Sequence, residues 1–201
     1  LNKSTYVITI PPRGSEYVVL LSQLAKQLPV NAKILYISST SVYPDNNRVV
    51  TEKDAMKRIS PHSGISLLDA EKAIASMKNP CTIIRMPGLY GPDRHPGRFM
   101  ANKTYVAWAK NPVNLVHLDD CIGIIHTVIK NSYWNEVINA CSDEHPSRTE
   151  FYTKATELIG EDAPVFSDEK LPFKIVDNSK SKNVLGYSYK HPDPLTGLLS
   201  I

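Results

Sequence analysis

The sequence predicts an α/β fold in which one parallel sheet carries helices on its faces. Four short runs rich in Val, Ile and Leu alternate with segments in which apolar residues recur every three or four positions. The runs contain few charges, as expected for parallel strands buried on both faces. Hydrophobic residues make up 42% of the 201 residues, which suits a folded core and argues against a disordered chain.

The predicted elements alternate along the chain. Strands are expected at 5–10, 34–38, 82–86 and 136–140, with a short extended piece at 114–118. Helices are expected at 15–28, 63–77, 99–110, 121–130 and 148–159, with a short one before Gly186. Residues 44–61 and 89–97 are polar or rich in turn-forming residues and predict loops. The opening strand–helix–strand order favours a right-handed parallel crossover.

The helices carry end signals and apolar faces. Ser147-x-x-Glu150 is a capping box, and Asp119 is a good N-cap for the helix at 121–130. Asp119 and Asp120 are therefore predicted to cap rather than to catalyse, and His117 is predicted to be structural. The residues expected to face the core share helical spacing. They are Tyr17, Leu20, Leu21, Leu24 and Leu28, then Leu67, Ala70, Ile74 and Met77, then Ile122, Ile125 and Ile129, and finally Phe151, Ala155, Leu158 and Ile159.

The stretch at 34–43 ends a buried strand in a cluster of hydroxyl groups. Ser38 to Ser41 follow the apolar run directly, and Tyr43 comes two residues later. Ligands of open α/β sheets bind outside the carboxyl ends of the strands, so these hydroxyls lie where chemistry could occur. The alternative is an ordinary Ser/Thr turn at the end of a strand.

Composition and charge exclude several classes of protein. The net charge is +3 without a basic tract, which argues against nucleic acid as a partner. No apolar run approaches the roughly 20 residues of a membrane span, so no membrane partner is expected, and the first residues do not resemble a signal peptide. Cys81, Cys121 and Cys141 are odd in number and far apart. They fit neither a disulfide framework nor a zinc site and predict a cytoplasmic location.

Four motifs occur in a fixed order and point to one family. They are Ser38-Ser-Thr-Ser-Val-Tyr43, Leu68-x-Ala-Glu71, Arg85-Met-Pro-Gly-Leu-Tyr-Gly-Pro92 and Val116-His-Leu-Asp-Asp120. Together they resemble the extended short-chain dehydrogenases/reductases, the NAD-dependent epimerase/dehydratase group. The resemblance covers residues 5 to 187 and is to the atypical members, whose active sites are incomplete.

The resemblance implies a Rossmann-like sheet, an NAD or NADP cofactor, and a small carbonyl, alcohol or nucleotide-sugar substrate. It divides the chain into a Rossmann-like domain at 1–140, with an excursion at 93–112 toward the substrate, and a small carboxyl-terminal lobe at 141–201. Ser39, Tyr43 and Ser63 are the implied catalytic positions, with Ser39 matching the family's Ser/Thr. The implied cofactor-binding residues are Pro11, Pro87, Gly88, Leu89 and Tyr90.

Two departures from the family bear on activity. The family's Tyr-x-x-x-Lys pair falls on Ser63 and Leu67, which cannot supply the same acid–base chemistry. Ser63 is interpreted more simply as a helix-start residue, and Tyr43 as a packed side chain with a satisfied hydroxyl. The family's Gly-x-x-Gly-x-x-Gly turn is also absent, so about 70 residues of a full member are expected ahead of Thr5 and NAD(P) binding by these residues alone is predicted to be weak.

The loop after the third strand offers a further candidate site. Arg94, His95 and Arg98 lie close together in it. Arg94 and Arg98 could clamp an anionic substrate, because Arg binds phosphate and carboxylate bidentately. The alternative is a solvated basic loop. Arg148 and His145, which flank the capping box, are predicted to be structural.

Two functions from different classes remain open from the sequence. The first is an oxidoreductase or isomerase of atypical type, and the second is a non-catalytic ligand-sensing or scaffold protein, which the replacement of lysine by Leu67 favours. The strand at 5–10 contains no charged residue and would form an apolar sheet edge. A homo-oligomer is one expected way to cover it.

Overall fold

The computed structural model describes residues 4–57 and 66–201. Its central sheet has four strands, all parallel, in the order β1 (Thr5–Ile8), β2 (Lys33–Ser39), β4 (Cys81–Met86) and β7 (Val137–Asn139). The predicted parallel sheet is confirmed, because each strand forms within its expected range, apart from one residue at each end of β2 and one at the start of β4. Strand neighbours in the sheet follow their order along the chain, so each connection is a simple crossover.

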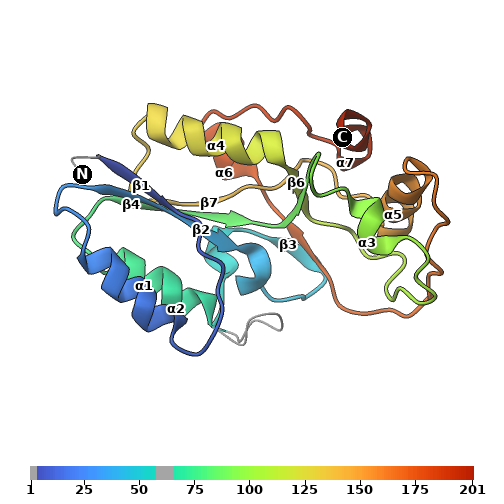
Figure 1. Cartoon of the computed structure of the whole chain (residues 1–201), viewed down its shortest axis with the longest axis horizontal. Coiled ribbons are helices and arrows are strands. Elements are labelled where there is room, and N and C mark those ends of the chain that lie inside the picture. Colours follow the sequence, from blue (N-terminus) through green and yellow to red (C-terminus); the bar gives the residue numbers. More distant parts are fainter. Residues whose placement is uncertain (1–3, 58–65) are drawn as a thin grey trace.

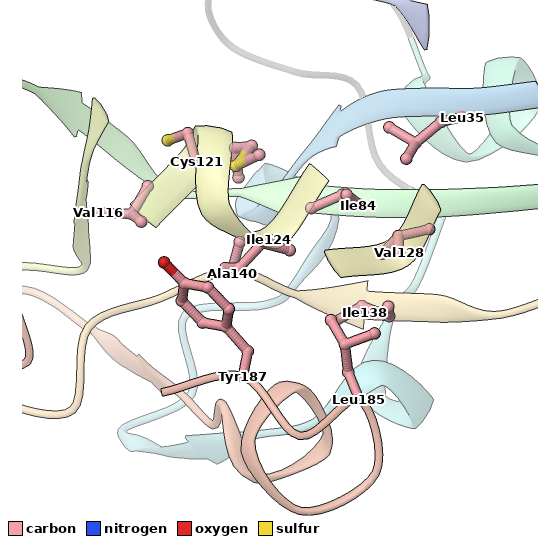
Figure 2. Packing of buried hydrophobic residues seen from close by; sticks show 11 residues of the cluster. Leu35, Ile84, Val116, Cys121, Ile124, Val128, Ile138, Ala140, Leu185 and Tyr187 are labelled. Atoms are coloured by element: carbon pink, nitrogen blue, oxygen red, sulfur yellow. The ribbon is translucent and has the colours of Figure 1, made fainter. Parts of the chain in front are cut away.

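Helices cover both faces of this sheet (Figure 1). Helices α1 (Tyr17–Lys26) and α2 (Leu67–Ala75) lie on one face, and α4 (Leu118–Lys130) lies on the other. Each layer has its own apolar core. Figure 2 shows the core under α4, where Ile124 and Val128 pack over Ile84 and Ile138 of the strands. No helix in the described part of the chain is long and apolar enough to cross a bilayer.

Two small parallel pairs of strands extend the fold beyond the carboxyl edge of the sheet. Strand β3 (Arg48–Val50) pairs with β8 (Lys174–Val176), and β5 (Gly88–Tyr90) pairs with β6 (Leu115–His117). The prediction of a plain loop at 44–61 is therefore wrong for its described part, which contains β3 and a 3-10 turn at Glu52–Asp54. The strand depends on a partner far along the chain, which local turn signals do not report.

Shorter elements complete the structure. They are a 3-10 turn at Thr40–Val42, α3 (Pro96–Met100), α5 (Arg148–Glu157), α6 (Ser179–Asn183), α7 (Pro194–Gly197) and a 3-10 turn at Leu198–Ser200. Helices α3, α5 and α7 lie beyond the carboxyl ends of the sheet strands (Figure 1). The helix expected at 99–110 is displaced to 96–100, because Pro96 suits the first position of a helix and His95 caps it. The capping box of Ser147 and Glu150 is confirmed.

The face of α4 that packs against the sheet is not the predicted one. The buried residues are Asp120, Cys121, Ile124 and Val128, whereas Ile122 is 57% exposed. The cause is Asp120, whose buried carboxylate accepts hydrogen bonds from the Tyr187 hydroxyl (2.8 Å) and from the backbone N–H groups of residues 190 and 191 (2.7 and 3.0 Å). A polar residue thus sets the rotation of the helix. Leu20 and Leu24 of α1 and Leu158, at the end of α5, are likewise exposed, contrary to prediction.

The N-cap of α4 also differs from prediction. His117, not Asp119, holds this position, and its Nδ1 accepts the backbone N–H of Asp119 at 3.1 Å. Asp119 lies instead in the first turn, where its negative charge still suits the helix dipole. His117 is buried, as expected for a structural histidine.

Candidate functional site

The ends of β2 and β4 open onto a cleft of about 1170 Å³. Ser39 lies in register with Met86, so the residues that follow each strand emerge side by side. Ser39, Thr40 and Ser41 line the cleft from one strand, and Pro87, Gly88 and Leu89 line it from the other. This volume suits a drug-sized or cofactor-sized ligand, and its place at the carboxyl edge matches the usual ligand site of open α/β sheets.

Ser39 is partly exposed in this cleft and also stabilises the local turn. Its Oγ accepts the backbone N–H of Ser41 at 3.1 Å, so it caps the 3-10 turn at Thr40–Val42. This leaves its O–H hydrogen to donate to a ligand. The two interpretations drawn from the sequence, a turn residue and a site residue, are therefore compatible.

Tyr43 does not offer its phenol to the cleft, which corrects its selection as a catalytic position. Its side chain is fully buried, and its hydroxyl donates to Asn139 Oδ1 (2.6 Å) and accepts from Arg85 Nη1 (2.8 Å). Burial raises the pKa of Tyr43 to about 12 although Arg85 lowers it. A phenol that is so hard to ionise and so enclosed is a packing and hydrogen-bonding group.

The segment expected to pass the nicotinamide is divided between cleft and core. Pro87, Gly88 and Leu89 line the cleft, but the side chain of Tyr90 is 1% exposed and packs edge-on against His117, with ring centroids 5.0 Å apart. Gly88 is needed for close strand packing, because a Cβ there would lie 2.8 Å from Leu115 Cδ2. Pro11 is exposed beyond the end of β1 and is not part of the cleft wall.

Of the two arginines expected to clamp a substrate, Arg94 alone lines the cleft. Arg94 lines the cleft, where its Nε donates to the carbonyl oxygen of Leu89 at 3.1 Å and its guanidinium lies 5.4 Å from the Phe99 ring centroid. Arg98 is exposed and does not line the cleft. The two side chains therefore do not form one clamp.

A buried polar network lies under the cleft floor. The Arg85 guanidinium forms two hydrogen bonds with the Glu71 carboxylate, and the Ser38 hydroxyl donates to the same carboxylate at 2.6 Å. Arg85 Nη1 also donates to the backbone carbonyl of Glu52 at 3.0 Å. These bonds tie α2, β2 and β4 together directly beneath Ser39, so they hold the strand ends that shape the cleft.

The family's acid–base pair has no counterpart in the described residues. Ser63 lies outside them. Leu67 is 5% exposed in an apolar cluster with Val42, Val50 and Val176. A lysine at this position would have to bury its charge among aliphatic groups, which is costly without a partner. The leucine at the position of the family's lysine therefore belongs to the apolar core.

The far side of the cleft contains residues that the sequence analysis does not assign to a site. Trp108, Arg148 and Lys174 line its far side, although Arg148 was expected to be structural. Lys174 Nζ donates to Asp45 Oδ1 at 2.8 Å and to the carbonyl oxygen of Tyr43 at 3.1 Å. Their positions depend on the pairing of β8 with β3 and on the docking of α5. The one local signal is the large aromatic side chain of Trp108.

A second cluster of ligating groups is formed by His117, Asp119 and His191. Their ligand atoms lie within 4.8 Å of one another. The Nδ1 lone pair of His117 is already used by the backbone of Asp119, and the imidazoles of His117 and His191 are in contact, with centroids 3.9 Å apart and planes tilted by 41°. Burial lowers the pKa of His117, and the neighbouring His191 lowers it further. This geometry suits two imidazoles in contact that fasten the carboxyl-terminal segment to α4 better than a metal centre.

The parallel sheet, the helices on both faces and the cleft at the carboxyl edge define a Rossmann-like α/β protein. Solved structures share this fold. MoeE5, in complex with UDP-glucuronic acid and NAD, matches with a TM-score of 0.79 and 20% identity over 99% of this chain and 78% of that chain. UDP-glucuronic acid 4-epimerase from Bacillus cereus, in complex with NAD, matches with a TM-score of 0.79 and 22% identity over 99% and 73%.

One sequence relative is much more similar. Protein YeeZ of Escherichia coli K12 is 35% identical over 208 residues, which span 97% of this chain and 74% of YeeZ. The chain belongs to the family of Protein YeeZ. No protein-family model matches it. A functionally unknown conserved protein from Silicibacter pomeroyi DSS also shares the fold, with a TM-score of 0.76 and 21% identity over 98% of this chain and 76% of that chain.

Proposed function

We propose that the cleft binds NAD or NADP together with a small carbonyl, alcohol or nucleotide-sugar substrate, and that the protein is an oxidoreductase or isomerase of atypical type. The observation that carries this proposal is the meeting of the Ser39 hydroxyl with the Pro87–Gly88–Leu89 backbone at one wall of the cleft. A hydroxyl donor beside a main-chain surface suits a carbonyl next to a flat ring. The NAD held by MoeE5 and by the Bacillus cereus epimerase supports the choice of cofactor.

Each wall of the cleft has a part in this proposal. The cofactor would supply hydride exchange with the substrate carbon. Ser39 would donate its hydrogen to the substrate oxygen, and the backbone at 87–89 would support the nicotinamide ring. The cations Arg94, Arg148 and Lys174 outnumber the single acid Asp45 around the cleft, so its field favours an anionic substrate. These 201 residues contain no glycine-rich turn for the pyrophosphate, so the contacts proposed for them are with the nicotinamide end of the cofactor.

Turnover is expected to be slow. General acid–base catalysis typically contributes about 10²–10⁴-fold, and Leu67 supplies no charge to lower the pKa of an acid. A second candidate function follows from the same residue. Because Leu67 packs in an apolar cluster, a non-catalytic protein that senses a ligand in the cleft is the favoured alternative.

The test begins with saturation-transfer NMR on NAD⁺ mixed with the protein, which detects weak binding. The nicotinamide protons should receive more saturation than the adenine protons, and the Ser39→Ala variant should keep this signal. NADH formation is then followed with UDP-glucose as a trial alcohol. Ser39→Ala should lower any turnover by about 10²-fold or more, as loss of an oxyanion donor does, whereas Ser76→Ala on the exposed end of α2 should not.

The outcomes separate the two candidate functions. Turnover that depends on Ser39 supports the enzyme. Nicotinamide binding without any turnover, with a panel of alcohols and nucleotide sugars, supports the sensing protein. The absence of saturation transfer to the nicotinamide contradicts the cofactor proposal and with it the oxidoreductase or isomerase.

A further inference from the structure

The guanidinium of Arg148 is held in the cleft by aromatic rings instead of by an acid. Its central carbon lies 5.5 Å from the Trp108 ring centroid and 5.2 Å from that of Tyr152. Within the described residues its side chain makes no hydrogen bond or ion pair, and its Nε is buried without a partner. Stacking occupies the faces of a guanidinium and leaves the N–H groups on its edge to bind in the plane.

The other charged groups of the cleft are already paired. Asp45 accepts from Lys174, and Arg94 donates to the Leu89 carbonyl oxygen. Glu150 lies two residues beyond Arg148. Its carboxylate accepts hydrogen bonds from the Ser147 backbone N–H at 2.8 Å and from the Ser147 hydroxyl at 2.7 Å, within the capping box. Among the described residues, Arg148 is therefore the cation of the cleft wall whose side chain makes no hydrogen bond. Such a group gains most from an incoming anion, because no existing bond has to break.

The backbone fixes the position of this side chain. The loop that carries Trp108 docks on the start of α5 through hydrogen bonds from Arg148 N to the Asn111 carbonyl oxygen (2.9 Å) and from Thr149 N to the Ala109 carbonyl oxygen (3.0 Å). Trp108 itself has φ of 66°, a left-handed conformation that is strained for a large side chain. Strain that persists at a cleft wall is typical of binding sites. The strained residue is the one that stacks on Arg148.

A second cavity meets the cleft at the same pair of residues. It has a volume of about 200 Å³, and Arg148 and Trp108 line it together with Lys103 and Tyr105. The pair thus stands at the junction of a large cleft and a small side cavity. A compact charged group at the end of a longer ligand fits such a junction.

We infer that Arg148 binds the anionic group, a phosphate or a carboxylate, of the ligand that enters the cleft, and that Trp108 and Tyr152 hold the guanidinium edge-on for bidentate contact. This assignment rests on the proposed function and deepens it. It makes Arg148 a binding residue that selects charged over neutral substrates. It requires no chemistry at Arg148, whose charge is permanent.

The experiment is calorimetric titration of the protein with inorganic pyrophosphate, with D-glucuronate and with UDP. The Arg148→Gln variant should bind the recognised anion about 10- to 100-fold more weakly, the usual worth of a charge-assisted hydrogen-bonded pair. Loss confined to pyrophosphate and UDP identifies a phosphate, and loss confined to glucuronate identifies a carboxylate. Arg148→Lys should lie between, because it keeps the charge without the planar fork. Arg98→Gln, which removes an exposed arginine outside the cleft, should bind as the parent does.

A second variant covers the case in which Arg148→Gln does not fold. Trp108→Gly removes the stacking ring and suits the positive φ, so the fold should persist while anion affinity falls about 10-fold or more. Equal affinities of the parent and both variants, or no binding of any of the three anions by the parent, would overturn the assignment. The nicotinamide signal in NMR is independent of these titrations. Anion binding that depends on Arg148 without that signal therefore contradicts the cofactor proposal alone.

Discussion

Glu71 and Arg85 form a buried ion pair with two parallel hydrogen bonds, Nε to Oε1 at 3.0 Å and Nη2 to Oε2 at 2.7 Å. Both side chains are 5% exposed. The pair joins α2 to the middle of the sheet, and its residues come from two of the motifs that resemble the family. Its role is to fix the ends of β2 and β4, from which the cleft is built.

Glu71→Gln should destabilise the protein strongly. Removing one partner of a buried pair leaves an uncompensated charge, which typically costs about 3–5 kcal/mol. The free energy of unfolding from urea denaturation measures this. Glu136→Gln, which breaks the more exposed bond to Lys180, should cost far less. An equal loss of unfolding free energy in the two variants would contradict the prediction that burial makes the Glu71–Arg85 pair more costly to break.

Tyr43→Phe should lower stability and leave ligand binding unchanged. The substitution removes the donor to Asn139 Oδ1 and one of the two acceptors of Arg85 Nη1, which keeps its bond to the Glu52 carbonyl oxygen, for an expected loss of about 1–3 kcal/mol. Urea denaturation and titration with pyrophosphate give the two readouts. Tyr105→Phe, which removes an exposed hydroxyl bonded to Glu169, should leave stability nearly unchanged. Weaker anion binding by Tyr43→Phe would contradict this prediction and show that the Tyr43 hydroxyl contributes to the binding site.

Stability should fall as the pH drops below about 6.5, the ordinary pKa of histidine. Burial lowers the pKa values of His95, His117 and His145 in the folded protein, so in this pH range the unfolded chain binds more protons and is favoured. The stabilising contribution is present at neutral pH and declines as the pH falls toward the lowered folded values. Thermal denaturation between pH 5 and pH 8 measures the slope.

His117→Asn isolates one contributor to that slope. Asparagine is a good N-cap and does not titrate, so the pH dependence should become shallower while α4 keeps its cap. The matched variant is His126→Asn, on the exposed side of the same helix, which should retain the slope of the parent. An unchanged slope in His117→Asn would contradict the assignment.

Gly97→Ala should disturb the anion site from a distance. A Cβ at Gly97 would overlap the carbonyl oxygen of Ala155, so α3 and α5 must move apart. Because α5 carries Arg148, affinity for pyrophosphate should fall together with stability. Gly14→Ala is the control, since its φ of 76° makes alanine unfavourable in open space far from the cleft. It should lose stability without losing affinity.

In a protein of residues 1–201 alone, the edge formed by β1 should promote self-association. Within the described residues β1 pairs with β2 alone, and Val7 and Ile10 are largely exposed. Val7→Lys places a charge on this edge and should reduce association, as charged edge residues do. Light scattering at several concentrations measures the mass. Val30→Lys, in an exposed turn, should have no such effect, and a concentration-independent monomer in the parent would contradict the prediction.

The sheet could be predicted from the sequence because its strands are local, apolar and separated by helices. The cleft wall at Ser39 and Pro87 followed from the same reasoning, since parallel strands end at one edge. The orientation of α4 could not be predicted from the sequence, because the hydrogen bonds of the buried Asp120 carboxylate outweigh the apolar pattern of the helix. Arg148 could not either, because its setting is created by a loop that lies 40 positions away, as the hydrogen bond between Thr149 and Ala109 records.

The pairing of β3 with β8 bears on how the protein forms during synthesis. The hydrogen bond from Phe173 to Asn47 beside this pair spans 126 positions, whereas the central strands pair in the order in which they leave the ribosome. Domains fold from the amino terminus as they are made, and contacts between distant segments come late. A nascent chain would therefore complete its sheet first and acquire Lys174 and the far wall of the cleft last. Ligand binding would begin as one of the final events of maturation.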